Sequence, residues 1–249
     1  MIKIKSAIKK VILSIIPHFV KKHYLSNEND LVESLKKKHA LISYSQQGED
    51  LAIERFFQGK RSGFYVDVGA FDPVIYSNTK LFYDMGWTGI NIEANSDKIH
   101  RFNTLRPKDI NLNVGVSDEA GKLDYFVFNA PALNTFNSAN AKRWSEKPGF
   151  EILKTHEVEV LPLKDILKLH LNEGQSIDFM TIDVEGWDLK VLASNDWQKF
   201  RPKLVLVEEV VKNCLSDSRV FSFLDDISYE LWSIAGGTMI FKDAMPRQG

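Results

Sequence analysis

The chain has 249 residues, of which 44% are hydrophobic and 26% are charged, and its formal net charge is −1. This length suits one substantial domain with a small appendage, and the charge balance argues against a nucleic-acid partner, which usually requires a basic excess. The single cysteine, Cys214, excludes an internal disulfide framework and a cysteine-based zinc cluster, and it fits a reducing cytoplasm. No apolar run approaches the roughly 20 residues that cross a bilayer.

Residues 1–24 combine lysines with apolar residues at helical spacing, interrupted by Pro17. One interpretation is a basic amphipathic helix that makes peripheral contact with an anionic membrane, at its inner face for a cytoplasmic protein. The other is a helix whose apolar stripe packs on the domain or on the second copy of a homodimer. The chain is therefore divided into a helical extension, 1–42, and a main domain, 43–249.

In the main domain, a first predicted helix over 41–57 is followed by alternating strands and helices, which is typical of a parallel sheet covered on both faces. The predicted strands cover 64–68, 88–92, 110–116, 177–182 and 203–207. The predicted helices cover 79–85, 97–105, 163–170, 189–193 and 220–227, and a hairpin over 229–241 ends the domain. Two further strands, 122–128 and 156–160, are expected to pair. Between them the polar segment 129–149 forms a substrate lid or a disordered loop.

The first strand and the second each end in residues typical of a nucleotide site. Asp67 lies at the end of the first strand and Gly69 just past it, and Glu93 lies just past the second, where an acid can accept hydrogen bonds from both ribose hydroxyls. A G-x-G-x-x-G loop is absent, and no Lys or Arg lies within 64–79 to meet a pyrophosphate. These features predict a nucleoside ligand without phosphates. S-adenosylmethionine fits, because its cationic sulfonium suits an acid-lined pocket.

Further acids follow the later strands. Because the carboxyl ends of parallel strands meet at one edge of a sheet, we expect these acids to gather there. The later acids are Asp118, Asp183, Glu185, Glu208 and Glu209, and they join Asp67 and Glu93 at or just past the ends of strands.

With these motifs the chain resembles the FkbM-type S-adenosylmethionine-dependent methyltransferases, from about Ser43 to Phe241. The matching motifs are Ser45-Gln-Gln-Gly-Glu-Asp50, Tyr65-Val-Asp-Val-Gly-Ala70, Ser77-Asn-Thr79 with Gly86-Trp87, Gly89-Ile-Asn-Ile-Glu93, and Asp178-Phe-Met-Thr-Ile-Asp-Val-Glu-Gly186. The resemblance implies an α/β, Rossmann-like class I methyltransferase fold. Its sheet is seven-stranded and mostly parallel, with helices on both faces and a reversed terminal hairpin. Pro73 stands where the broader class I pattern has a second glycine in the loop after the first strand. This departure affects the expected course of that loop but not the expected cofactor.

The resemblance, with the positions of the acids, assigns cofactor-binding residues. Glu93 is expected at the ribose, with Gly69 under the methionyl part and Asp67 at its amino group. The remaining assignments are Ser117 and Asp118 at the adenine amino group, Gln47 and Glu49 closing over the cofactor or capping a helix, and Asn78 capping its helix or contacting the methionyl carboxylate.

Methyl transfer to oxygen is an in-line displacement, and a hydroxyl needs help from a base or a metal near neutral pH. One interpretation, by analogy with metal-dependent O-methyltransferases, is a Mg²⁺ ion held by Asp183, Glu208 and Glu209, since all offer oxygen ligands. The other is direct base catalysis by Glu185, Asp183 or His156. The sequence leaves both alternatives open. In both, Asp183, Glu185, Glu208 and Glu209 form the half of the site where the methyl acceptor arrives.

The resemblance implies O-methylation of a sugar in a cell-surface glycan, or of a natural product. Amides in 129–144 and the aromatic rings of Phe136, Trp144 and Trp187 are candidate sugar contacts. Two other function classes share some of these features. An NAD-linked oxidoreductase would use Glu93 on a ribose but lacks the second and third glycines, and a non-catalytic nucleoside-binding module predicts loss of the acids that are present. An N-methyltransferase lacks its usual Asn/Asp-Pro-Pro-aromatic tetrad here.

Overall fold

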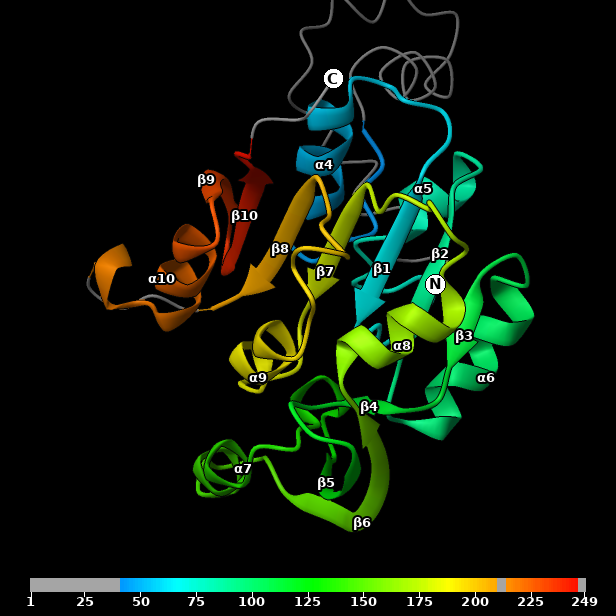
Figure 1. Ribbon diagram of the computed structural model, residues 1–249. Coiled ribbons are helices and arrows are strands. Elements are labelled where there is room, and N and C mark those ends of the chain that lie inside the picture. The colour runs from blue at the N-terminus through cyan, green and yellow to red at the C-terminus, as the bar shows by residue number, and fades with distance from the viewer. Residues whose placement is uncertain (1–40, 210–213, 246–249) are drawn as a thin grey trace, which may run out of the picture. The chain divides into compact units, whose positions relative to one another are not determined.

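The computed structural model describes residues 41–209 and 214–245 (Figure 1). The predictions made for residues 1–24 lie outside the described residues. Within the described ranges, no helix is long and apolar enough to span a membrane.

The main sheet has seven strands in the order β3-β2-β1-β7-β8-β10-β9. All neighbours are parallel except β10, which runs antiparallel to both β8 and β9. The strands are β1 (Phe64–Val68), β2 (Thr88–Ile92), β3 (Ile110–Leu112), β7 (Phe179–Ile182), β8 (Leu204–Glu208), β9 (Tyr229–Ala235) and β10 (Thr238–Asp243). This order, with its reversed terminal hairpin, confirms the predicted class I methyltransferase fold.

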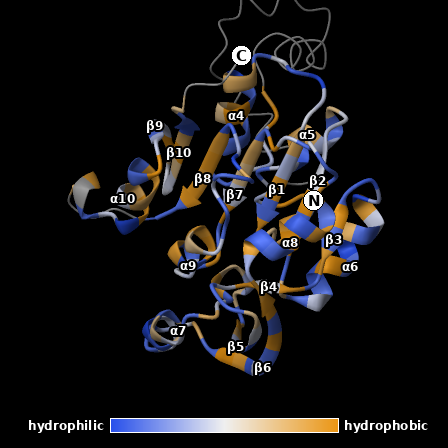
Figure 2. Ribbon diagram, viewed as in Figure 1, coloured by the Kyte–Doolittle hydropathy of each residue, from blue (hydrophilic) through white to orange (hydrophobic). Residues whose placement is uncertain are grey.

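Helices cover both faces of the sheet because its central strands bury side chains on both sides. Along β1, Val66 packs in one hydrophobic cluster with Leu163 and Val191. Tyr65 packs in another, with Ile53 and Phe82. Figure 2 shows the hydrophobic strands at the centre. The helices are α4 (Glu49–Phe57), α5 (Lys80–Asp84), α6 (Ser96–Leu105), α8 (Leu163–His170), α9 (Asp188–Ala193) and α10 (Arg219–Asp226), with a 3₁₀ turn η2 (Leu215–Asp217).

A second, three-stranded sheet lies beyond the carboxyl ends of the main parallel strands, which point toward it in Figure 1. Its order is β4-β6-β5, and β5 and β6 pair antiparallel. Its elements are β4 (Gly115–Val116), β5 (Gly121–Phe128) and β6 (Ile152–Leu161), and the segment between β5 and β6 holds η1 (Pro131–Leu133) and α7 (Ser138–Ser145). We call residues 129–149 the insertion. It is an ordered cover containing a helix, which begins where the Asn137 side chain accepts from the N–H groups of Ala139 and Asn140.

The structure corrects two predicted boundaries. The helix expected over 41–57 begins only at Glu49, because Gly48 has φ +87° and the Asp50 carboxylate accepts from Ser45 Oγ and the Tyr44 N–H, which fixes a turn instead. The strand expected over 110–116 is two strands in different sheets.

The break in that strand follows from side chains on either side of it. The Asn113 amide donates to the carbonyls of Glu93 and Ala94, which ends the pairing with β2. Gly115 then packs so closely on Phe136 that a Cβ atom would lie 2.6 Å from the ring. The chain therefore leaves the main sheet for the small one.

Candidate active site

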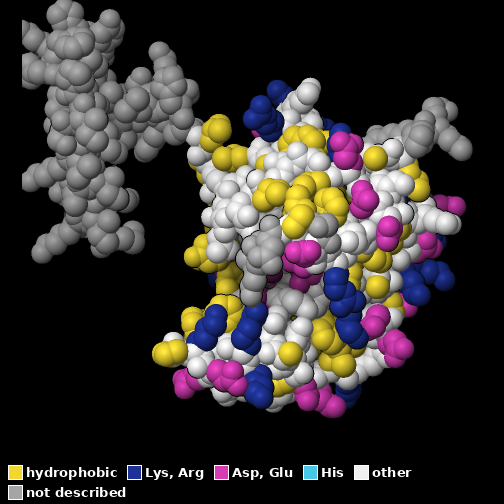
Figure 3. Space-filling view, turned by 90° about the vertical axis from the view of Figure 1, so that its left-hand side faces the viewer, with side chains coloured by type: hydrophobic (Ala, Val, Ile, Leu, Met, Phe, Trp, Pro, Cys, Tyr) yellow, Lys and Arg dark blue, Asp and Glu magenta, His cyan; other side chains and the backbone are white. Residues whose placement is uncertain are grey.

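A cavity of about 250 Å³ lies at the carboxyl ends of β1, β2, β7 and β8 and is covered by β5 and the insertion. In the space-filling view a hollow opens on one face of the molecule, and acidic side chains lie in it (Figure 3). Eight of the sequence-predicted site residues line the cavity, namely Glu49, Asp67, Gly69, Asn78, Glu93, Asp183, Glu185 and Glu208.

Glu93 follows β2 and is fixed by the backbone around it. Its two carboxylate oxygens accept from the N–H groups of Phe71 (2.8 Å) and Asn95 (2.7 Å). Burial raises the pKa of Glu93, and these two hydrogen bonds oppose that rise. Each oxygen keeps a further lone pair, so the carboxylate is a rigid acceptor for two donors inside the cavity.

Asp67 and Gly69 lie where the chain leaves β1. Asp67 accepts from Thr79 Oγ1 (2.8 Å), and burial raises its pKa to about 6, against the opposing effects of Thr79 and Arg106. Gly69 has φ +80°, and a Cβ atom there would lie 1.9 Å from the carbonyl oxygen of Asp183. This position therefore requires glycine, because the end of β7 passes directly against it.

Asn78 and Glu49 close the same side of the cavity. The Asn78 amide donates to Thr181 Oγ1 (3.0 Å) on β7, which turns the side chain toward the sheet edge. Glu49 accepts from the Gln47 N–H (2.8 Å) and from Thr238 Oγ1 (3.2 Å), so it links α4 to β10.

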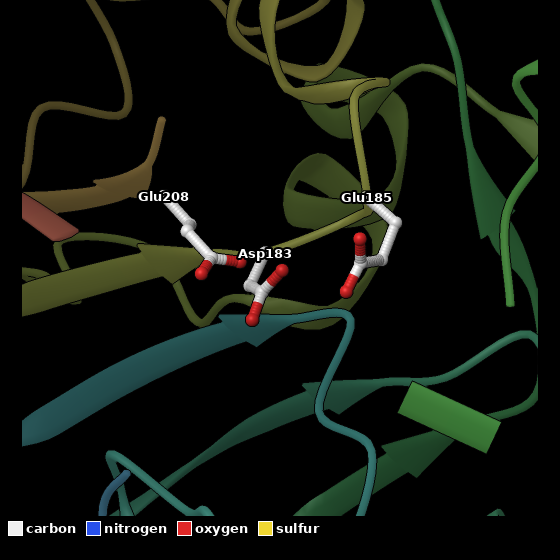
Figure 4. Close-up of side chains that lie close together, drawn as sticks. All are labelled: Asp183, Glu185 and Glu208. Atoms are coloured by element: carbon white, nitrogen blue, oxygen red, sulfur yellow. The ribbon is translucent and has the colours of Figure 1, made fainter. Parts of the chain in front are cut away.

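On the other side, Asp183, Glu185 and Glu208 form an acidic cluster. Each offers a carboxylate oxygen, and the three oxygens lie within 4.8 Å of one another. Asp183 follows β7, Glu208 ends β8, and Glu185 faces them from the loop after β7 (Figure 4). Asp183 is open to water from within the cavity, although protein surrounds it on most sides.

Two members of the acidic cluster, Asp183 and Glu185, have raised pKa values. Burial, followed by repulsion from Glu208 and Asp188, raises the pKa of Glu185 to about 7. Burial and the charges of Glu208, Asp188 and Glu185 raise the pKa of Asp183 well above its usual range. Ionising three carboxylates this close together is unfavourable because their negative charges repel. The cluster is therefore suited to take up a proton or to bind a hard cation.

A family model described as "Methyltransferase FkbM domain" matches residues 67–229, which is more than half of the chain. The chain belongs to the FkbM methyltransferase family. It is thus an S-adenosylmethionine-dependent methyltransferase, and the NAD-linked and non-catalytic interpretations are not favoured.

One similar solved structure is described as the O-methyltransferase from Bacillus cereus in complex with SAH. The two chains share 12% identity, the match covers 90% of this chain and 96% of that chain, and the TM-score is 0.36. A comparison with curated proteins gives no match.

Five predicted site residues of the FkbM protein lie in the described part of the chain but do not line the cavity. Ser117 donates to Asp118, and Asp118 is exposed, where the hydrogen bond from Lys190 lowers its pKa. Glu209 accepts from Ser218 at the start of α10, so Glu185 and not Glu209 joins Asp183 and Glu208. The last two are His156, which lies on β6 opposite Tyr125, and Gln47, whose neighbour Gln46 lines the cavity instead.

Several cavity residues were missed on the sequence. Thr181 is a polar residue inside an otherwise apolar strand, which was a usable signal. Tyr125 on β5 was also missed; it packs on Phe136 of the insertion, one of the expected sugar contacts, with ring centroids 4.8 Å apart, and both rings line the cavity. The amides of Asn137 and Asn140, expected among the sugar contacts, instead donate to carbonyl groups of the loop that carries Glu185.

Proposed function

We propose that this methyltransferase acts on a hydroxyl group, and that the hydroxyl belongs to a sugar of a cell-surface glycan or a related glycoconjugate. The observation that carries the oxygen acceptor is the acidic cluster of Asp183, Glu185 and Glu208. A sugar hydroxyl is a weak nucleophile near neutral pH, so its attack requires a nearby group that removes the proton or polarises the oxygen.

In this proposal the opposite wall holds S-adenosylmethionine. Glu93 accepts from the two ribose hydroxyls, for which its free lone pairs suffice. Gly69 lies under the methionyl part, where a side chain has no room, and Asp67 accepts from the amino group. Asn78 and Glu49 complete this wall. The acids also favour the cationic sulfonium over its neutral product.

Glu185 is proposed as the base. A lone pair of the acceptor hydroxyl forms the new bond to the methyl carbon, and the carbon–sulfur bond breaks with its electron pair going to sulfur. The hydroxyl proton passes to the Glu185 carboxylate. A pKa of about 7 suits this transfer, because half of the carboxylates are then ionised near neutral pH and the acid formed is not too strong to hold the proton.

The same carboxylates also fit Mg²⁺, which takes oxygen ligands only. Asp183 and Glu208 would hold the ion, and its chemistry would be to polarise the acceptor oxygen. Chelation separates the two versions: direct base catalysis predicts full activity after thorough treatment with EDTA, whereas loss of activity that added Mg²⁺ restores supports the metal.

The sugar class is supported by the mouth of the cavity. Tyr76 is 54% exposed, lines the cavity and stacks on Phe71 with ring centroids 6.3 Å apart. An exposed ring beside carboxylates offers an apolar face and hydrogen-bond acceptors, which matches the two surfaces of a sugar. A natural product with a hydroxyl is the alternative acceptor.

The test is a transfer screen with methyl-labelled S-adenosylmethionine against cell-envelope glycans and, in parallel, hydroxylated natural products. Label in a methyl ether of a glycan supports the proposal, and label confined to the natural products or to nitrogen contradicts it.

We further propose that residues 1–24 bring the enzyme to a membrane where lipid-linked glycans are built. Deleting them should lower binding to anionic vesicles; unchanged binding favours packing within the protein or a homodimer, which sedimentation would detect.

A further inference from the structure

The loop that carries Glu185 has an unusual backbone. Glu185 has φ +53° and Gly186 has φ +88°, so two successive residues are left-handed. Glycine tolerates this region, whereas a residue with a side chain is strained there. Such a conformation persists only where surrounding contacts fix it.

The insertion supplies these contacts. The carbonyl oxygen of Glu185 accepts from Thr135 Oγ1 (3.0 Å) and from Asn140 Nδ2 (2.7 Å). The carbonyl oxygen of Gly186 accepts from Asn137 Nδ2 (2.9 Å). Three side chains from one segment therefore bind two adjacent carbonyl groups about fifty residues away in the chain.

The N–H groups of the Glu185 loop are bound by Asp188, and the loop packs closely on the insertion. The Asp188 carboxylate accepts from the N–H groups of Val184 (3.2 Å) and Gly186 (3.0 Å). A Cβ atom on Gly186 would lie 2.0 Å from the Asn140 amide nitrogen. Thr135 is itself buried, and its Oγ1 accepts from the Asn137 N–H (2.9 Å). The loop thus has one set of partners on each side and little room to shift.

We propose that Thr135, Asn137 and Asn140 are positioning residues that hold the Glu185 backbone in its left-handed conformation and so direct the carboxylate at Asp183 and Glu208. The insertion then serves the chemical step as a brace on the catalytic loop, in addition to covering the cavity. This inference rests on the proposed role of Glu185 as the base.

Substitutions at Thr135 and Asn140 should therefore lower kcat more than they raise KM for either substrate. Thr135→Val keeps the shape but removes the hydroxyl, whereas Thr135→Ser keeps the donor. We expect Thr135→Val and Asn140→Ala to lower kcat by about 10- to 100-fold, as a misplaced reacting group does. Thr135→Ser should retain kcat within a factor of about 3.

Asn129 provides a matched control within the insertion. Its amide donates to the Gly149 carbonyl (2.9 Å) and its oxygen accepts from the Glu151 N–H, so it has similar hydrogen bonds but no contact with the Glu185 loop. Amide hydrogen exchange at 184–186 in the cofactor-free full chain should accelerate in Asn140→Ala and not in Asn129→Ala.

A double-mutant cycle with Glu185→Gln decides whether the effect runs through Glu185. Single-turnover rates with labelled cofactor should fall on Asn140→Ala in the wild-type background and change little in the Glu185→Gln background. An equal fall in both backgrounds, unchanged exchange at 184–186, or loss of kcat in Thr135→Ser as large as in Thr135→Val would overturn the inference. Full activity of Glu185→Gln would instead refute the base, and exchange would still report whether the insertion braces the loop.

Discussion

Glu185→Gln should stabilise the protein above neutral pH while abolishing most of its activity. Burial and the neighbouring acids raise the pKa of Glu185 from 4.5 to about 7. At about 1.4 kcal/mol for each pKa unit, the ionised side chain costs the folded state at most about 3 kcal/mol. Glutamine has nearly the same shape and cannot ionise, so this cost disappears in the variant.

The pH window follows from the sign of the change. Because the pKa is higher in the folded than in the unfolded chain, the wild type has its full stability below about 4.5 and loses the contribution as the pH rises through about 7. The gain in the free energy of unfolding of Glu185→Gln should therefore be about 1 kcal/mol at about pH 5 and about 3 kcal/mol at about pH 8.

Urea denaturation in the presence of EDTA measures this gain, provided that the m-values agree. Glu173 is exposed, and Glu173→Gln is the matched control, for which the gain should stay near zero at both pH values. A gain that does not depend on pH, or a less stable Glu185→Gln above neutral pH, would refute the account of the acidic cluster.

Other substitutions test the opposite wall and its support. Glu93→Ala should weaken binding of S-adenosylmethionine by about 1–3 kcal/mol in calorimetry, because buried donors lose their acceptor; unchanged affinity would exclude the ribose assignment. Gly69→Ala should destabilise the fold by about 1–3 kcal/mol and reduce cofactor affinity, since its Cβ meets the Asp183 carbonyl, and a thermal melt like that of the wild type would contradict this. Arg106 is fully buried and donates to Pro73, Ser77 and Thr79. Arg106→Met should lower the free energy of unfolding by about 1–3 kcal/mol, because the buried oxygens of Pro73, Ser77 and Thr79 lose their donor; an unchanged free energy of unfolding would count against this buried network.

The central sheet and part of the site could be predicted because they depend on local sequence. Asp67 lies near the end of β1, and Glu93 and Asp183 directly follow β2 and β7; the end of a parallel strand in this fold is also the edge of the cavity. The strand pattern was therefore enough to bring these residues to one place.

The misplaced residues show what the same rule leaves out. Glu208 and Glu209 are neighbours in an extended chain, so their side chains point in opposite directions and only one can face the cavity. Gln46 and Gln47 lie in the turn before α4, where the course of the backbone decides which of the two side chains lines the cavity. Asp118 also follows a strand, β4, but β4 pairs with β6 in the small sheet. The sequence did not reveal that β4 leaves the main sheet, because the pairing with β2 ends through a contact between the Asn113 amide and the Glu93 carbonyl.

The brace on Glu185 could not be predicted, because it depends on contacts between distant segments. The amide-rich insertion was visible, but its partners are carbonyl groups, which every residue has. The left-handed Glu185 also has no sequence signal, since glutamate rarely adopts that conformation without external contacts.

The most direct test of the account is a comparison of labelled methyl transfer to a cell-envelope glycan by the wild type and by Glu185→Gln, with cofactor affinity measured alongside. We expect a labelled methyl ether from the wild type, a rate lower by about 10²–10⁴-fold in the variant, and equal affinity for S-adenosylmethionine in both. A variant that transfers methyl groups at the wild-type rate would contradict the claim that the acidic cluster activates the acceptor.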